Sequence, residues 1–151
     1  MIENKIKELG LALPPAPAAL ATYVPAIQTG SFIFTSGQLP LADGKVQHPG
    51  KLGQEVLIEN AKLACQTALL NALAAIKTRV SLDHITPVKM GVFVASAPEF
   101  TEQHLVANGA SDLLKNIFTE KGNHARFAVG VASLPLNACV EIELTVYVNQ
   151  H

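Results

Sequence analysis

One apolar stripe between residues 54 and 79 constrains the fold of this chain more than any other feature of its sequence. Apolar residues recur there at steps of three and four positions: Leu57, Ala61, Cys65, Ala68, Leu69, Ala72, Leu73 and Ile76. This spacing predicts an α-helix from about Gln54 to Arg79 with one apolar face. Acidic Glu55 and Glu59 lie in its first turns, where the helix dipole favours negative charge. Such a helix has to pack against a second layer.

The remaining segments alternate between strand-like and helix-like patterns. Strands are predicted at residues 22–30, 31–37, 87–96, 124–132 and 139–148. Helical spacing predicts a short helix over 2–9, ending at Gly10, and a longer one from Thr101 to Lys121 that Gly109 weakens in the middle. Residues 42–53 have the glycine, proline and aspartate content of a loop. This order predicts an α+β fold with two helices packed on one face of a mixed sheet.

Composition narrows the class of protein. A chain of 151 residues is expected to form one domain over 1–151, in which residues 1–16 are an N-terminal helix and a proline-rich lead-in. Only 15% of the residues are charged and 49% are hydrophobic, so an oligomer would relieve the shortage of polar surface. A net charge of -1 without a Lys/Arg cluster disfavours nucleic-acid partners. The absence of a signal-like or membrane-spanning apolar run predicts a cytoplasmic protein with no membrane partner.

The sequence predicts neither a metal site nor a nucleophilic serine. The histidines show no paired spacing of the kind that binds zinc on a helix. Ser36 lacks the GxSxG setting of a nucleophile elbow. Cys65 and Cys139 lie in apolar runs without CxxC spacing, which is typical of buried thiols in a reducing compartment. No metal is therefore expected.

The last two predicted strands mix apolar and charged residues in alternation. Successive side chains of a strand point to opposite faces, so Arg126, Ala128 and Gly130 are separated from the apolar residues between them. In the final strand, Glu141 and the polar residues that alternate with it are separated from Val140, Ile142, Leu144, Val146 and Val148. We expect Arg126 and Glu141 to share the face opposite the helices, together with small residues such as Gly91. Small residues there would let a second copy of the chain approach, with polar clefts at the seams.

The sequence pattern allows three interpretations of Arg126 and Glu141. They form a structural ion pair between neighbouring strands, or Arg126 pairs with Glu143 instead. Alternatively, the planar guanidinium of Arg126 holds a ligand carboxylate through two hydrogen bonds while Glu141 transfers a proton. The alternation of the strands does not choose between them.

Several short motifs occur together in the order and spacing of a known family. They are PAALATYV (residues 17–24), TSGQLP (35–40), the region around Asn71, the residue Asn108, and the HAR…LP…VEIE block (124–143). With these motifs the sequence resembles the RidA (reactive intermediate/imine deaminase) family, also called YjgF or endoribonuclease L-PSP, in a divergent and longer branch. The resemblance covers most of the chain from Pro17 onward.

The resemblance implies a chorismate-mutase-like α+β fold. It also implies a homotrimer whose sheets form a central barrel, with ligand sites in the clefts between subunits. The family's catalytic positions fall on Arg126, which would bind a substrate carboxylate, and on the acid Glu141. Its substrate-binding positions fall on Tyr23, Ser36, Gly37, Asn108 and Ala128. The match of Asn108 requires a one-residue insertion before Arg126.

Three positions depart from the family's pattern: Ala128 stands in place of a cysteine, His124 in place of a proline and Ser111 in place of a tyrosine. The activity implied is hydrolytic deamination of small enamines or imines derived from amino acids, giving 2-oxo acids and ammonia. No metal or organic cofactor is expected for this reaction, because an imine carbon is already electrophilic. The alternative is a non-catalytic trimer that binds small carboxylates or has a regulatory role. A ribonuclease role, suggested only by the family's older label, is disfavoured because the sequence lacks a basic patch.

Overall fold

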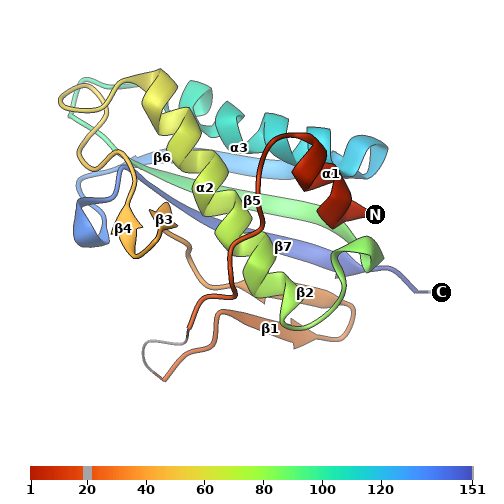
Figure 1. Cartoon of the computed structure of the whole chain (residues 1–151). Helices are drawn as coiled ribbons and strands as arrows, with labels where there is room; N and C mark the ends of the chain where they lie inside the picture. The colour runs from red at the N-terminus through yellow and green to blue at the C-terminus, as the bar shows by residue number, and fades with distance from the viewer. Residues whose placement is uncertain (19–21, 151) are drawn as a thin grey trace.

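The computed structural model describes residues 1–18 and 22–150, and Figure 1 shows a sheet with its helices on one side. The helices are α1 (Ile2–Glu8), α2 (Ile58–Lys77) and α3 (Gln103–Phe118). The main sheet contains β1 (Ala26–Thr29), β2 (Phe32–Thr35), β5 (Ile85–Ala95), β6 (Ala125–Val131) and β7 (Val140–Val148). A small hairpin contains β3 (Leu41–Ala42) and β4 (Lys45–Val46), and short 3₁₀ turns are η1 (Leu82–His84), η2 (Thr119–Gly122) and η3 (Pro135–Asn137). Residues 19–21, part of the PAALATYV motif, lie outside the described residues, as does His151.

The main sheet is mixed, with the strand order β1-β2-β7-β5-β6. Strands β5 and β6 are parallel, and every other neighbouring pair is antiparallel. The parallel pair is joined through α3, because parallel strands need a crossover connection. Helix α2 lies against β7 and β2, and α3 lies against β5, β6 and α2. The predicted α+β fold with helices on one face of a mixed sheet is confirmed, and the short helix α1 adds a third helix to that layer.

Helix α2 begins later than its periodic pattern predicts. Its apolar stripe from Ala61 to Ile76 is buried, as expected. The helix starts at Ile58 and not at Gln54, because the residues before it form a turn that satisfies its own polar groups. The carboxylate of Glu55 accepts a hydrogen bond from the backbone N–H of Lys51 at 2.9 Å. Glu55 therefore closes the preceding turn and does not occupy the first turn of the helix.

Helices α2 and α3 meet at a glycine. A Cβ atom added to Gly109 would lie 2.5 Å from the backbone oxygen of Lys62 and 2.6 Å from its Cα. The two helix backbones can approach this closely only because Gly109 has no side chain. From the sequence, Gly109 was expected to weaken α3. In the structure this glycine allows the close contact between α2 and α3.

The predicted loop at residues 42–53 contains the β3–β4 hairpin. Asp43 and Gly44 both have positive φ angles, 52° and 75°, as a two-residue type I′ turn requires. The Asp-Gly pair is a strong hairpin signal that the loop prediction did not use. The side-chain amide of the buried Asn71 donates to the carbonyl oxygens of Leu39 and Leu41, both at 3.0 Å. Asn71 thus fixes the segment before the hairpin onto α2.

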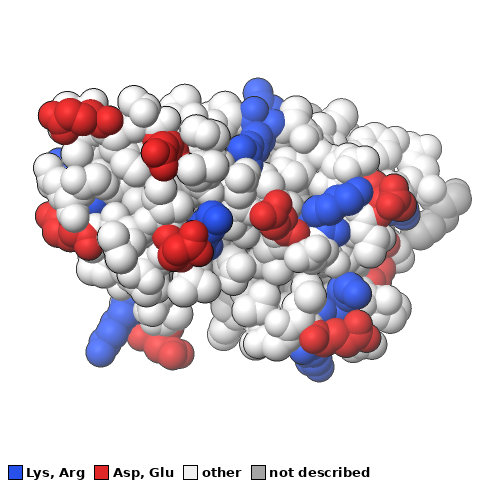
Figure 2. Space-filling model, turned by 90° about the horizontal axis from the view of Figure 1, so that it is seen from above, with Lys and Arg blue, Asp and Glu red and all other residues white. Residues whose placement is uncertain are grey.

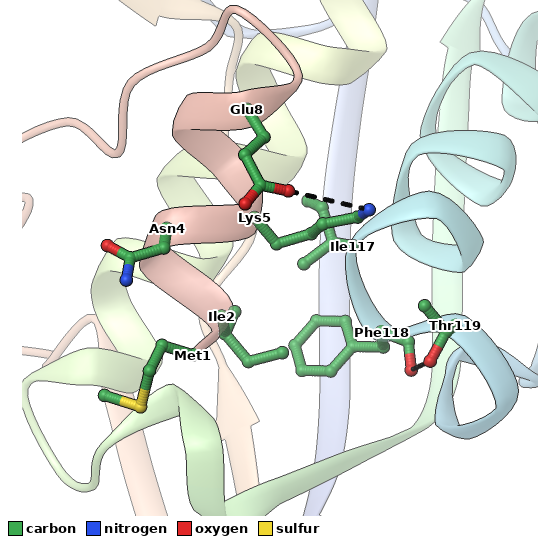
Figure 3. Close-up of a pocket in the computed structure, with 8 residues that line it drawn as sticks. All are labelled: Met1, Ile2, Asn4, Lys5, Glu8, Ile117, Phe118 and Thr119. Atoms are coloured by element: carbon green, nitrogen blue, oxygen red, sulfur yellow. Dashed lines mark hydrogen bonds and ion pairs between the residues drawn. The ribbon is translucent and has the colours of Figure 1, made fainter.

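Helix α1 packs on the C-terminal end of α3, as the close-up in Figure 3 shows. Ile2, Ile117 and Phe118 lie together there, and the residues around them line a shallow pocket. The backbone N–H of Ile2 donates to Asp83 in η1 at 2.6 Å, and Glu3 forms an ion pair with Lys77 of α2 at 2.9 Å. The N-terminal helix is therefore fastened to the helix layer at three points, and its pocket contains none of the predicted site residues.

The two faces of the sheet differ in what covers them. On the helix side, Met90, Val92 and Val94 of β5 pair in register with Leu144, Ile142 and Val140 of β7, and all six are buried. On the opposite face, large apolar side chains stay exposed: Ile27 at 54%, Phe32 at 41%, Phe34 at 44% and Val129 at 43%. We call this second surface the open face. An apolar sheet face of this kind is normally covered by another layer.

Candidate functional site

Arg126 lies on the helix side of the sheet, which corrects the prediction from strand alternation. Strand β6 pairs with β5 so that Arg126 is opposite Met90 and Ala128 is opposite Val92, and paired residues share a face. Ala128 packs against the core. The prediction failed because alternation separates two sets of residues but does not say which set faces the helices. In the edge strand β6 the apolar set, including Phe127, faces the open side.

Helix α3 holds the guanidinium of Arg126 through three hydrogen bonds. Nη1 donates to Oδ1 of Asn108 at 2.9 Å and to Oγ of Ser111 at 3.0 Å, and Nη2 donates to the carbonyl oxygen of His104 at 3.1 Å. Positions 104, 108 and 111 are four and three residues apart, so they share one face of the helix. Asn108 was among the predicted site residues, whereas Ser111 and the carbonyl of His104 were not. Their helical spacing is the signal that could have identified them.

The guanidinium keeps donors for a ligand. An arginine has five N–H donors and no acceptor. Within residues 1–18 and 22–150, Arg126 has no carboxylate partner, and its Nε–H has no hydrogen-bond partner. A cation that is held in place yet not neutralised is a ready site for an anion such as a carboxylate.

The hydrogen bonds around Arg126 continue from Ser111 to His124. His124 is two residues before Arg126. Its Nε2 lies 2.9 Å from Oγ of Ser111, and its Nδ1 lies 2.8 Å from the carbonyl oxygen of Gly122. The structure places His124 half-buried and bonded at both ring nitrogens.

Glu141 lies on the open face of β7. It is opposite Phe93 of β5 in the sheet register. The segment that contains Gly37 lies beside it, because Gln38 and Ile142 exchange backbone hydrogen bonds of 2.8 and 2.9 Å. A Cβ atom on Gly37 would come within 2.9 Å of the carboxyl carbon of Glu141. Only glycine lets this carboxyl group lie directly against the backbone.

Ser36 directly precedes Gly37 in the chain, and its hydrogen bonds reach back to the residues that follow Tyr23. The hydroxyl of Ser36 donates to the carbonyl oxygen of Val24 at 2.6 Å, and its backbone N–H donates to Pro25 at 2.8 Å. These bonds fix the segment that follows Tyr23, whose side chain is 54% exposed. The hydroxyl of Ser36 is occupied by this structural bond.

The pKa of Glu141 is raised above the ordinary glutamate value, first because burial disfavours the charged form and then because Glu143 is nearby. The folded protein therefore binds this proton at a higher pH than the unfolded chain does. The stability linked to the protonated form is present at low pH and is lost as the pH rises from the ordinary glutamate range through the raised pKa.

We expect replacement of Glu141 by glutamine to remove the loss of folding stability that accompanies rising pH. Thermal unfolding midpoints measured from about pH 4 to 8 should show the E141Q variant gaining stability relative to the wild type as the pH rises. Replacement of Glu143 by glutamine is the matched control, and it should shift the dependence less because burial is the larger cause. Parallel pH profiles for E141Q and the wild type would contradict the assignment.

Arg126 and Glu141 lie on opposite faces of the sheet, and both ion-pair interpretations are excluded within the chain. Strand β5 separates β6 from β7, so the two residues are not on neighbouring strands. Glu143 shares the open face with Glu141 and does not meet Arg126 either. The predicted site residues therefore form two groups. The first contains Arg126, Asn108 and Ala128 at the α3–β6 edge. The second contains Glu141 and Gly37 at the open face, with Ser36 next to Gly37 in the chain. Tyr23 is exposed and is not shown to join either group.

The two cysteines are poor candidates for chemistry. Burial raises the pKa of both thiols, that of Cys139 to about 11. Both are free and buried. They therefore stay protonated and belong to the core, as the sequence predicted.

The family model described as YjgF/chorismate mutase-like matches residues 3–148. This range includes both groups of candidate residues. The chain belongs to this family. Its resemblance to RidA proteins and its chorismate-mutase-like fold are thereby confirmed. The assignment does not by itself give an activity.

Three relatives show the range of similarity. Protein TCP17 of Trypanosoma cruzi is 40% identical over 151 residues, which cover 98% of this chain and 94% of that protein. The crystal structure of Atu1372 from Agrobacterium tumefaciens, a protein of unknown function, is 45% identical, has a TM-score of 0.92 and covers 98% of this chain and 92% of its own. A 2-iminobutanoate/2-iminopropanoate deaminase of Dermatophagoides farinae is 27% identical over 139 residues, covering 91% of this chain and 94% of that protein.

Charge is mixed on the face seen in Figure 2. This view from above Figure 1 shows Lys and Arg interspersed with Asp and Glu, without a broad patch of one sign. A basic stripe of the kind that binds nucleic acid is not visible on this face. Within the described residues, no helix has both the length and the apolar character needed to cross a bilayer.

Proposed function

We propose that this protein hydrolyses small imines or enamines derived from amino acids, giving 2-oxo acids and ammonia. The observation that carries the proposal is the state of Arg126. Its guanidinium is fixed on α3 by three hydrogen bonds, and donors including Nε–H remain free for a ligand. A carboxylate of a 2-imino acid has the charge and the planar geometry that this arginine would bind.

Glu141 supplies the proton chemistry in this proposal. Water adds to the electrophilic imine carbon, while Glu141 takes a proton from that water and returns one to the nitrogen. In the adduct, which carries a hydroxyl and an amino group on one carbon, Glu141 then removes the hydroxyl proton and passes it to the nitrogen. The C–N bond breaks with its electron pair going to nitrogen, ammonia leaves, and the oxygen forms the carbonyl of the 2-oxo acid. A carboxyl group with a raised pKa suits both steps, because it exchanges a proton more readily near neutral pH than an ordinary glutamate does.

A second copy of the chain completes the site in this proposal. Arg126 and Glu141 are on opposite faces of one sheet, so a single chain does not offer both to one small ligand. In an oligomer, the α3–β6 edge of one subunit would meet the open face of its neighbour. The exposed apolar residues of the open face support such packing, since Ile27, Phe32 and Phe34 would then leave water. We propose a homotrimer, in which every subunit gives one group to each of two sites.

Family membership supports the chemistry. The mite protein named 2-iminobutanoate/2-iminopropanoate deaminase matches this chain over 91% of its length. Its name concerns two small 2-imino acids. We extend that substrate class to this chain because the resemblance assigns the family's carboxylate-binding arginine to Arg126 and its acid to Glu141.

Ammonia release from 2-iminopropanoate generated in situ tests the proposal. Arg126→Ala should lower kcat/KM at least about 10- to 150-fold, the equivalent of roughly 1.5–3 kcal/mol for a charged hydrogen-bonded contact. Arg126→Lys is the control that keeps the charge without the planar fork, and it should recover only part of the loss. A fully active Arg126→Ala variant, folded to the same extent as the wild type, would rule the mechanism out.

A non-catalytic carboxylate-binding protein is the alternative. It is favoured by the same fixed arginine, because the bonds from α3 to Arg126 do not depend on Glu141. A thermal-shift screen with 2-oxo acids distinguishes the two functions. Stabilisation by these acids together with no detectable ammonia release would favour the binding protein.

A further inference from the structure

Ser111 and His124 form a hydrogen-bonded chain with Arg126 whose direction follows from simple chemistry. The carbonyl oxygen of Gly122 can only accept, so Nδ1 of His124, 2.8 Å away, carries the hydrogen. In the neutral imidazole Nε2 is then an acceptor, and the hydroxyl of Ser111 at 2.9 Å donates to it. The oxygen of Ser111 keeps its lone pairs for Nη1 of Arg126 at 3.0 Å. The chain therefore runs from Arg126 through Ser111 and His124 to Gly122.

This direction determines how Arg126 is held. Nη1 carries two hydrogens, and Asn108 and Ser111 offer it two acceptors. With the hydroxyl hydrogen of Ser111 bound to His124, no hydrogen of Ser111 points at the guanidinium. Nη1 is therefore satisfied by α3, and Nε–H stays free. An arginine side chain otherwise has many rotamers, and holding it in one of them lowers the cost of binding a ligand.

We propose that Ser111 and His124 are positioning residues that orient Arg126 for a 2-oxo or 2-imino carboxylate. The inference rests on the carboxylate-binding role given to Arg126 in the proposed function. Neither residue touches the ligand in this scheme.

Pyruvate, a 2-oxo acid with one carboxylate, is the probe for this role. Calorimetric titration of the intact protein at fixed pH should give a Kd for S111A about three- to tenfold weaker than for the wild type, the effect of losing one hydrogen bond of ordinary strength. The effect is not larger because Asn108 and His104 still hold the guanidinium. Ser111→Thr keeps the hydroxyl and should bind pyruvate within about twofold of the wild type. H124F keeps a planar ring but removes the acceptor, and it should also weaken binding, because the hydroxyl hydrogen of Ser111 loses its fixed partner.

A double-mutant cycle shows whether Ser111 acts through Arg126. In an R126A background, the further change S111A should leave pyruvate affinity unchanged, since no guanidinium remains to be oriented. In turnover, S111A should raise KM and change kcat little. The inference would be overturned if the losses of pyruvate affinity in R126A and S111A added independently. It would also be overturned by an unchanged Kd in S111A and H124F, or by a wild type that does not bind pyruvate. Pyruvate binding that depends on Ser111 without any ammonia release would uphold it while contradicting the proposed deaminase activity.

Discussion

Two inactive variants should restore activity when their subunits are mixed. The first variant is Arg126→Ala, and the second is Glu141→Gln. If each site takes Arg126 from one subunit and Glu141 from the next, equal mixing leaves roughly one site in four with both groups intact, so about a quarter of the wild-type rate should return. Each variant alone should be about 10- to 1,000-fold slower than the wild type, given the usual effect of losing a charged contact or a general acid–base group.

The physical reason is the position of the two residues in the sheet. Arg126 shares its face with Met90 and Glu141 shares its face with Phe93, and these are opposite faces of β5. No rotamer of either side chain passes through a sheet that is packed with side chains on its helix side. A shared site is therefore possible between chains and not within one.

Coexpression of the two variants with different affinity tags supplies the mixed oligomers, and ammonia release measures the activity. A chain that carries both substitutions, coexpressed with Arg126→Ala, is the matched control and should stay inactive. A mixture that contains both tags in one particle yet remains as slow as the separate variants would show that the two residues do not act in one site. A protein that is monomeric at assay concentration would show the same.

The candidate residues could be found from the sequence, but their arrangement could not. Arg126 and Glu141 stand out as charges in apolar strands, and the family motifs assign them roles. The face of each residue depends on the register of β6 against β5, which involves residues about 36 positions apart in the chain. In a central strand such as β7 burial makes the apolar set face the core, whereas in the edge strand β6 Phe127 and Val129 face the open side. Sequence alternation alone carries no such information.

The helices and strands were easier to predict than their ends. The stripes of α2 and α3 extend over several turns, and the core residues of β5 and β7 alternate as expected. The ends depend on single local bonds, such as the one from Lys51 to Glu55 that delays α2. Ser111 was noted only as a departure from the family's pattern. Its importance comes from contacts with Arg126 in β6 and with His124 just before that strand, which lie outside the sequence pattern of α3.

Gly109→Ala should destabilise the protein by about 1–3 kcal/mol, although the same change inside an exposed helix usually stabilises it by about 1 kcal/mol. The usual gain arises because alanine restricts the unfolded chain more than glycine does. At Gly109 the added methyl group would lie 2.5 Å from the backbone oxygen of Lys62. Backbone atoms within a helix cannot rotate away as a side chain can, so α2 and α3 would have to move apart.

Such a movement would reach the candidate site as well as the core. Gly109 follows Asn108 directly and lies two residues before Ser111, and both of these bind Arg126. Denaturant unfolding of Gly109→Ala should therefore show a lower midpoint, and the folded variant should bind pyruvate more weakly. Asn116→Ala, at an exposed position of the same helix, is the matched control and should change stability by less than about 0.5 kcal/mol. A Gly109→Ala variant as stable as this control would mean that α2 and α3 do not depend on their close contact at Lys62, and that Arg126 is held by a helix free to shift.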